Sequence, residues 1–222
     1  MSERKAWRRL LVEGVVIVGS ILLAFSVDAW WDRTKTLAEE QEVLRALHVE
    51  LSSNRETLDR ASQQIEEGRA ALERFLVLSQ SEVGELAADS LSITNVFRRT
   101  FYGGLAAGFV DAAIRSGVGD TELRAALAEY ARLLTAVENS WSNTDDLSRD
   151  AMQLLGRHRG LQDPAAVVPD SSLWQEIRSD SVLVGVARAK WVYWGSQRAD
   201  GERLARHVDA LLSLVEWRLR IN

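Results

Sequence analysis

The sequence contains no cysteine, and only two of its 222 residues are proline, Pro164 and Pro169. The absence of cysteine excludes disulfide bonds, thiolate catalysis and cysteine-ligated zinc. The scarcity of proline leaves almost the whole chain free to form long helices, because proline is the residue that interrupts them. The sequence also lacks GxSxG, GxGxxG, HExxH and Walker A motifs, which argues against the common classes of enzyme.

Charge is unevenly distributed along the chain. The formal net charge is −5, yet four basic residues, Arg4, Lys5, Arg8 and Arg9, lie before residue 10. The remainder of the chain is therefore more acidic than the total indicates. An acidic domain repels the phosphate backbone, so nucleic-acid binding is disfavoured.

The segment from Leu10 to Trp31 is apolar, and no charged residue lies between Gly14 and Val27. Its length is close to the ~20 residues that a helix needs to cross the hydrocarbon core of a bilayer. Tryptophans lie at both of its ends, as in the aromatic belts of membrane proteins. We therefore predict a transmembrane anchor over residues 10–31, with Trp7, Arg8, Arg9, Trp30 and Trp31 at the membrane interfaces.

The basic N-terminus predicts the orientation of this anchor. Loops rich in lysine and arginine stay in the cytoplasm, which places residues 1–9 inside the cell and residues 32–222 outside it. In a bacterial inner membrane the second part is a periplasmic domain of a single-pass protein. Two alternatives remain open: a cleaved signal peptide, with Val27-Asp28-Ala29 as a weak cleavage site, and a buried core helix.

One face of the predicted anchor is small and polar. At 100° per residue, Glu13, Ser20, Ala24 and Asp28 share this face, which is suited to close contact with another transmembrane helix. Glu13 also lies one turn from Arg9, so an ion pair near the interface is the alternative role for its side chain. The segment contains no histidine, which removes the commonest axial ligand for haem.

After the anchor the pattern is helical. Apolar residues recur every seven positions at Leu37, Leu44, Leu51, Leu58, Ile65 and Leu72, whereas the intervening seam positions are mixed: Glu40, Leu47, Asn54, Ala61, Gly68 and Phe75. A two-stranded coiled coil requires both seams to be apolar. We therefore favour a long helix that packs into its own domain over a parallel dimer stalk. No proline separates it from the anchor, so one helix is predicted as far as about Ser79.

The rest of the chain is also predicted to be helical. A connection over 81–90 precedes two short helical pieces around Gly103–Gly104, which end at Gly117. A helix capped by Asp120 or Thr121 follows, with Leu123, Leu127, Tyr130, Leu134 and Val137 on its buried face. After a loop over 160–171, a short helix (172–179) and a long helix (181–219) complete the chain. The predicted fold is all-α, a transmembrane helix followed by an antiparallel helical bundle.

Three motifs resemble a family of bacterial single-pass membrane proteins that is known only as a domain of unknown function. They are the span ending in Asp28 to Trp31, the pattern Glu50–Leu51…Asn54 in a charged helix, and Ser116–Gly117 before a capped helix. The resemblance covers the N-terminal part of the chain and not the tryptophan-rich C-terminal helix. It implies a membrane anchor with a helical domain outside the cytoplasm, and it carries no catalytic residues.

The candidate chemistry is sparse. His48, His158 and His207 are far apart in sequence, and Asp145, Asp146 and Asp150 have the composition of a solvated face. An aromatic set near the C-terminus is more unusual, and its members Trp191, Tyr193, Trp194 and Trp217 are the candidate partner interface. Burial in the core and a small-molecule pocket are the alternatives for these residues.

These observations predict no catalytic residue, no cofactor and no metal site. The function that they favour is a non-catalytic, membrane-anchored interaction or scaffold protein, an accessory subunit of a larger inner-membrane assembly such as an energy-transducing complex. Its partners would be the lipid bilayer and other subunits, and a homo-oligomer is compatible with the pattern. The alternative is a periplasmic ligand-binding or sensory domain that acts through a second protein.

Overall fold

The structure, a computed structural model, describes residues 3–80, 96–97, 104–116, 121–157 and 171–221, and the side chains of these residues apart from 3–17, 116 and 171–173. All elements in these ranges are α-helices. Three are long: α1 (Glu3–Gln80), α5 (Thr121–Leu155) and α7 (Ser181–Ile221). Two are short: α4 (Gly108–Ser116) and α6 (Ser171–Ser179). The prediction of an all-α fold with long helices is confirmed.

The helix boundaries follow local chemistry. The predicted helix from the anchor to about Ser79 is α1, which ends at Gln80. Between α6 and α7, the carboxylate of Asp180 accepts hydrogen bonds from the backbone N–H groups of Val182 (2.9 Å) and Leu183 (3.1 Å). These are first-turn N–H groups with no partner inside the helix, so Asp180 starts α7 as an N-cap. The predicted connection over 81–90 and almost all of the loop over 160–171 lie outside the described residues.

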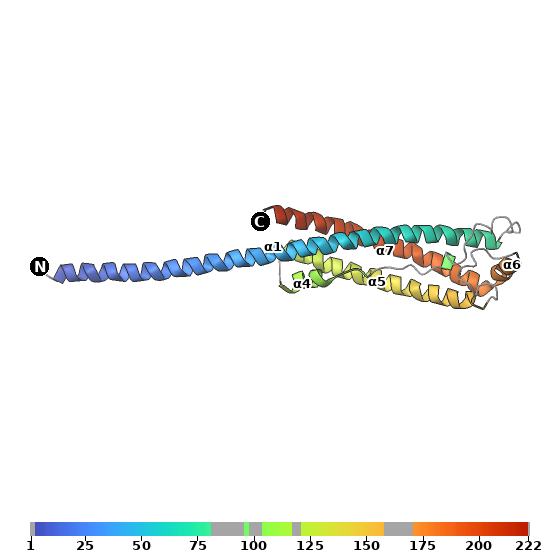
Figure 1. Cartoon of the computed structure of the whole chain (residues 1–222), viewed down its shortest axis with the longest axis horizontal. Helices are drawn as coiled ribbons and strands as arrows, with labels where there is room; N and C mark the ends of the chain where they lie inside the picture. Colours follow the sequence, from blue (N-terminus) through green and yellow to red (C-terminus); the bar gives the residue numbers. More distant parts are fainter. Residues whose placement is uncertain (1–2, 81–95, 98–103, 117–120, 158–170, 222) are drawn as a thin grey trace.

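The three long helices form an elongated bundle in which α7 runs antiparallel to α1 and α5 (Figure 1). Two side-chain contacts set the register of α1 against α7. The imidazole of His48 lies 3.2 Å from the carboxylate of Glu216, and the guanidinium of Arg198 lies 3.1 Å from that of Glu66. Residue numbers therefore rise along α1 as they fall along α7. The short helix α4 packs against α1 and α5.

The seam that the heptad pattern predicts on α1 is the face that the bundle buries. From Leu44 to Phe75 its apolar members are all less than a tenth exposed: Leu44, Leu47, Leu51, Leu58, Ala61, Ile65, Leu72 and Phe75. They contribute to two apolar cores, one with the end of α7 and the start of α5, the other with the start of α7 and the end of α5. The long helix thus packs into its own domain, as the mixed seam favours.

Two glycines occupy seam positions, and the structure uses them in opposite ways. A Cβ on Gly68 of α1 would overlap the indole ring of Trp194 in α7, so the missing side chain makes room for the tryptophan. Gly201 of α7 falls between the buried residues Gln197 and Leu204, yet a Cβ on it would meet nothing within 4 Å. One glycine is therefore required by packing, and the other leaves a space.

Substitution of these two glycines by alanine should change stability in opposite directions. Gly68→Ala forces Trp194 out of its site and should lower the free energy of unfolding by about 1–3 kcal/mol, the usual cost of overpacking. Gly201→Ala should raise it by about 0.5–1 kcal/mol, because alanine orders a helix at a lower entropic cost. Thermal unfolding of the purified chain, followed by far-ultraviolet circular dichroism, measures both. Equal melting temperatures for the two variants would contradict the packing described here.

Candidate functional site

The N-terminal part of α1 is the most unusual surface of the structure. Beyond the bundle the helix runs on alone, and every residue from Val18 to Glu39 is exposed (Figure 1). The large apolar side chains among them are more than two-fifths exposed: Val18, Ile21, Leu22, Leu23, Phe25, Val27, Trp30, Trp31 and Leu37. Contiguous apolar surface of this extent marks a site that contacts another protein or a membrane.

The predicted anchor residues lie on this projecting helix. Trp30 and Trp31 are 62% and 65% exposed, with their ring centroids 6.5 Å apart. Ser20, Ala24 and Asp28 are exposed on one face, as their spacing predicts. The side chains of Trp7, Arg8, Arg9 and Glu13 lie outside the described residues.

Among the described residues, no helix has a stretch both long and apolar enough to cross a membrane. The apolar segment of the sequence starts at Leu10, whereas the first side chain that the structure describes is that of Val18.

The aromatic residues of α7 do not form one surface. Trp194 is 2% exposed and belongs to the core against Gly68, whereas Tyr193 and Trp217 are 44% and 53% exposed. Trp191 is half-buried, with the guanidinium carbon of Arg69 4.9 Å from its ring centroid. At 1.5 Å per residue, Tyr193 and Trp217 are roughly 36 Å apart along the helix. These two aromatics are the most exposed of the set, and they lie on distant parts of α7.

The Glu50–Leu51…Asn54 pattern acts as a clamp on the glycine-rich segment before α4. Asn54 donates hydrogen bonds to the carbonyl of Ala106 (2.6 Å) and to the hydroxyl of Tyr130 (2.7 Å), and accepts one from the N–H of Ala106 (2.9 Å). The carboxylate of Glu50 accepts the N–H groups of Phe109 (2.9 Å) and Val110 (3.1 Å). A carboxylate at these N–H groups compensates both the unpaired donors and the positive end of the α4 dipole.

Burial in this clamp raises the pKa of Tyr130 to about 12, opposed in part by the hydrogen bond from Asn54. The hydroxyl therefore stays protonated at physiological pH. With the Asn54 side chain bonded on both its oxygen and its nitrogen, the polar groups of this cluster are directed at the protein itself. The cluster positions α4 and has the character of a structural element, not of a catalytic centre.

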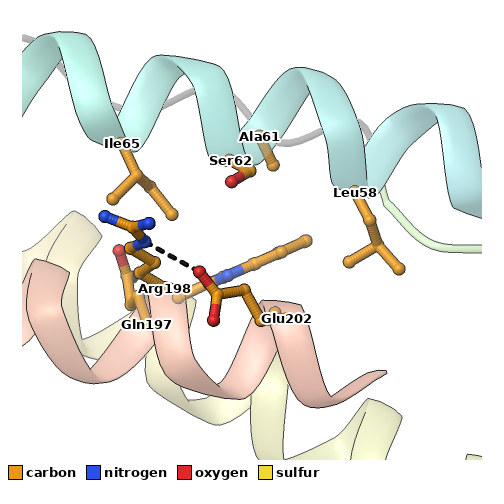
Figure 2. A pocket seen from close by; sticks show the side chains of 9 residues that line it. Leu58, Ala61, Ser62, Ile65, Gln197, Arg198 and Glu202 are labelled. Carbon is orange, nitrogen blue, oxygen red and sulfur yellow. Dashed lines mark hydrogen bonds and ion pairs between the residues drawn. The ribbon is translucent and has the colours of Figure 1, made fainter. Parts of the chain in front are cut away.

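A small cavity lies between α1 and α7 at the level of Gly201. Figure 2 shows Leu58, Ala61, Ser62 and Ile65 of α1 facing Gln197, Arg198 and Glu202 of α7 across it. Its volume is about 10 Å³, which is room for about one water molecule. An ion pair between Arg198 and Glu202 (2.8 Å) lies at its edge. Organic ligands need pockets of some 300 Å³ or more, so this cavity does not admit one.

The most perturbed ionisable group is Lys190, which lies in the core of the bundle. Its side chain is 0% exposed, and its Nζ lies 4.5 Å from the ring centroid of Trp194. Burial lowers the pKa of Lys190 from 10.5 to about 7, and the negative charge of Asp145 in α5 offsets part of this effect. The burial of Lys190 could have been predicted from the sequence. Its spacing from three buried residues, Leu183, Ala187 and Trp194, is that of one helix face.

The histidines and aspartates that the sequence singles out make ordinary side-chain contacts where the structure describes them. His48 pairs with Glu216, the imidazole of His207 lies 2.8 Å from the carbonyl of Ala126, and Asp146 pairs with Arg149 (3.0 Å). His158 lies outside the described residues. In the part of the chain that the structure describes, no three acidic or histidine side chains gather closely enough to hold a metal ion.

No protein-family model matches the chain, and neither a curated protein nor a solved structure matches it. The family resemblance of its motifs therefore stays a prediction. The structure supplies a physical role for one of these motifs all the same: Asn54 holds the segment before α4, and Glu50 holds the first turn of α4. Of the Ser116–Gly117 motif, Ser116 is the last residue of α4 and Gly117 lies outside the described residues.

Removal of the clamp amide should destabilise the bundle locally and globally. Asn54→Ala removes a partner from the part-buried peptide groups of Ala106 and from the buried hydroxyl of Tyr130, which should lower the free energy of unfolding by about 1–3 kcal/mol. Hydrogen exchange of the amides of Ala106, Phe109 and Val110 should accelerate at the same time. The matched control is Ser53→Ala, an exposed neighbour that should stay within about 0.5 kcal/mol of the wild type. Unchanged exchange in Asn54→Ala would show that the clamp does not hold this segment.

Lys190 should make stability depend on pH in a defined direction. Its pKa is about 7 in the folded state and 10.5 when unfolded, so the unfolded state binds more protons in between and stability rises over that window. The penalty for burying the charge is largest at and below pH ~7. Lys190→Met should therefore raise the free energy of unfolding by about 2–4 kcal/mol at pH ~6, with the gain vanishing above pH ~10. Denaturant titrations at both pH values measure this difference.

The control for this experiment is Lys35→Met, because Lys35 lies on the projecting part of α1 with its side chain 69% exposed. This variant should follow the wild type at both pH values. A pH-independent gain in Lys190→Met would mean that the lysine is not buried as a neutral amine.

Proposed function

We propose that the chain is a non-catalytic, membrane-anchored interaction or scaffold protein, an accessory subunit of a larger bacterial inner-membrane assembly. The observation that carries this proposal is the projecting part of α1, an unbroken helix whose large apolar side chains are exposed on all sides. Residues 10–31 of such a helix span roughly 33 Å, which fits the ~30 Å of a bilayer core.

The backbone of this segment supports a lipid environment. A membrane-spanning segment must satisfy its polar groups internally, and a continuous helix does so for every peptide group along its length. The hydroxyl of Ser26 follows the same rule, since it donates to the carbonyl of Leu22 at 2.7 Å. The basic N-terminus favours the cytoplasm for residues 1–9 and the periplasm for the bundle.

The interior of the bundle supports a scaffold over an enzyme. The buried polar side chains of Glu50 and Asn54 are bonded to the protein itself, and the cavity beside Gly201 has room for only about one water molecule. The exposed Tyr193 and Trp217 remain as partner contacts. A periplasmic sensory domain that binds a small molecule is the weaker alternative, because the cavity beside Gly201 is too small for such a ligand.

The anchor is tested by placing charge in it. The wild-type chain should remain in the membrane pellet after alkaline carbonate extraction, and a C-terminal reporter that works only outside the cytoplasm should be active. The double variant Leu23→Lys with Phe25→Lys should move to the soluble fraction, because each lysine near the centre of the span costs about 2.5–3.5 kcal/mol. The matched control carries Val49→Lys and Val77→Lys on exposed positions of α1 within the bundle, and should stay in the pellet.

A wild-type chain released by carbonate, or a reporter active only in the cytoplasm, would overturn the membrane proposal. The scaffold role has a separate test. Gentle solubilisation and native mass spectrometry should find the chain in a stoichiometric complex with another membrane protein. A monomer that binds no protein but melts at a higher temperature with a small molecule would favour the sensory alternative.

A further inference from the structure

The two apolar cores of the bundle meet at a level that is rich in buried polar side chains. The inner core contains the start of α5 and the end of α7, and the outer core contains the end of α5 and the start of α7. Apart from the clamp residues, the buried polar side chains of the described part all lie around the boundary, and we call them the polar belt: Thr144 and Ser148 of α5 with Lys190 and Gln197 of α7. On α5, Trp141 before the belt belongs to the inner core and Ala151 after it to the outer core.

The hydrogen bonds of the polar belt fall on one short stretch of α5. The amide of Gln197 donates to the carbonyl of Ser140 at 3.0 Å, and the hydroxyl of Thr144 donates to the same carbonyl at 3.2 Å. The hydroxyl of Ser148 donates to the carbonyl of Thr144 at 2.9 Å. A hydroxyl that bonds a carbonyl of the preceding turn slightly destabilises and often bends its helix. These contacts therefore weaken α5 between the two cores.

The helix α7 is weakened at the same level. Gly195 and Gly201 flank Gln197, and a Cβ on either glycine would meet nothing within 4 Å. Packing thus does not require glycine at these positions, whereas a glycine inside a helix lowers its stability through backbone entropy. The cavity of about 10 Å³ beside Gly201 also lies here, between α1 and α7. Both helices that cover α1 therefore have a weak point where one core gives way to the other.

The polar groups of the outer core are less well paired than those of the inner core. The indole N–H groups of Trp174 and Trp194 are buried in the outer core, and the described structure offers them no hydrogen-bond acceptor. The side chain of Lys190 is buried beside the same Trp194. An unpaired buried donor and a buried amine both lower stability. In the inner core, by contrast, the amide of Asn54 is bonded on both its oxygen and its nitrogen.

We propose that the two cores open as separate units with the polar belt as their boundary, so that the outer core opens while the inner core stays closed. In the open form the start of α7 leaves α1, which uncovers the seam from Ile65 to Phe75 together with Trp194. This apolar surface is hidden in the closed bundle and becomes accessible only through the opening. The inference concerns the bundle alone, so it goes beyond the proposed function and does not depend on the membrane anchor.

Native-state hydrogen exchange of the purified full-length chain tests this inference. The amides of residues 183–192 report on the outer core, and those of residues 204–215 report on the inner core. At low denaturant concentrations the outer amides should exchange at least about tenfold faster than the inner amides, relative to their intrinsic rates. Their exchange should also depend less on denaturant, because a partial opening exposes less surface than complete unfolding.

A matched pair of valine variants in α7 distinguishes two units from one. Val208→Ala removes two methyl groups from the inner core, where Val208 is 0% exposed, whereas Val192→Ala removes the same groups from a position that is 56% exposed. Val208→Ala should accelerate exchange at residues 204–215 about tenfold and leave residues 183–192 within about twofold of the wild type. Val192→Ala should leave both regions within about twofold of the wild type.

Two results would overturn the inference. Equal acceleration of both regions in Val208→Ala would show that the bundle opens as one unit. Wild-type exchange at residues 183–192 that is no faster than at residues 204–215 would show that the outer core does not open first. Neither result bears on whether the chain stays in the membrane pellet, so the proposed anchor stands or falls by its own test.

Discussion

The described structure depends on a single stripe of apolar side chains along α1. From Leu44 to Phe75 this stripe is buried by α5 and α7, and both apolar cores are built on it. A helix with one apolar face must cover it with other elements, and two long helices of matching period do so here. The clamp of Glu50 and Asn54 fixes the position of α4 in this packing. Glu50 bonds the first turn of α4, and Asn54 bonds both Ala106 before α4 and Tyr130 of α5.

The packing of α7 against α1 also depends on the volume and charge of individual side chains. The indole of Trp194 fills the space left by Gly68, and the ammonium of Lys190 lies against the same indole. A large aromatic side chain and a buried lysine thus lie together in the core formed by the start of α7 and the end of α5. Apolar side chains of the same volume would be enough to stabilise this core. The fit of Trp194 against Gly68 restricts which residue of α1 can face this tryptophan, and the buried lysine lowers the stability of the folded state.

The sequence predicts the helices and their inward faces well, because 3.6-residue periodicity reports directly on burial. Leu123, Leu127 and Tyr130 are buried as their spacing predicts. It does not predict which helix meets which, since periodicity carries no information about the partner. The role of Asn54 could not be predicted either, because its hydrogen-bond partners Ala106 and Tyr130 are far from it in the sequence. The aromatic set of α7 divides between core and surface because residues 191, 193 and 194 point in directions spread around the helix.

The environment of α1 changes along its length while its structure does not. No proline interrupts the helix, so the apolar part below Leu37 and the buried part above Leu44 belong to one stiff rod. If lipid surrounds the lower part, a tilt or rotation of the membrane segment must reach the two cores, because the same backbone carries both. A force applied to the lower part of α1 would therefore change the orientation of the whole bundle. That mechanical link is what distinguishes the projecting part of α1 from a flexible tether.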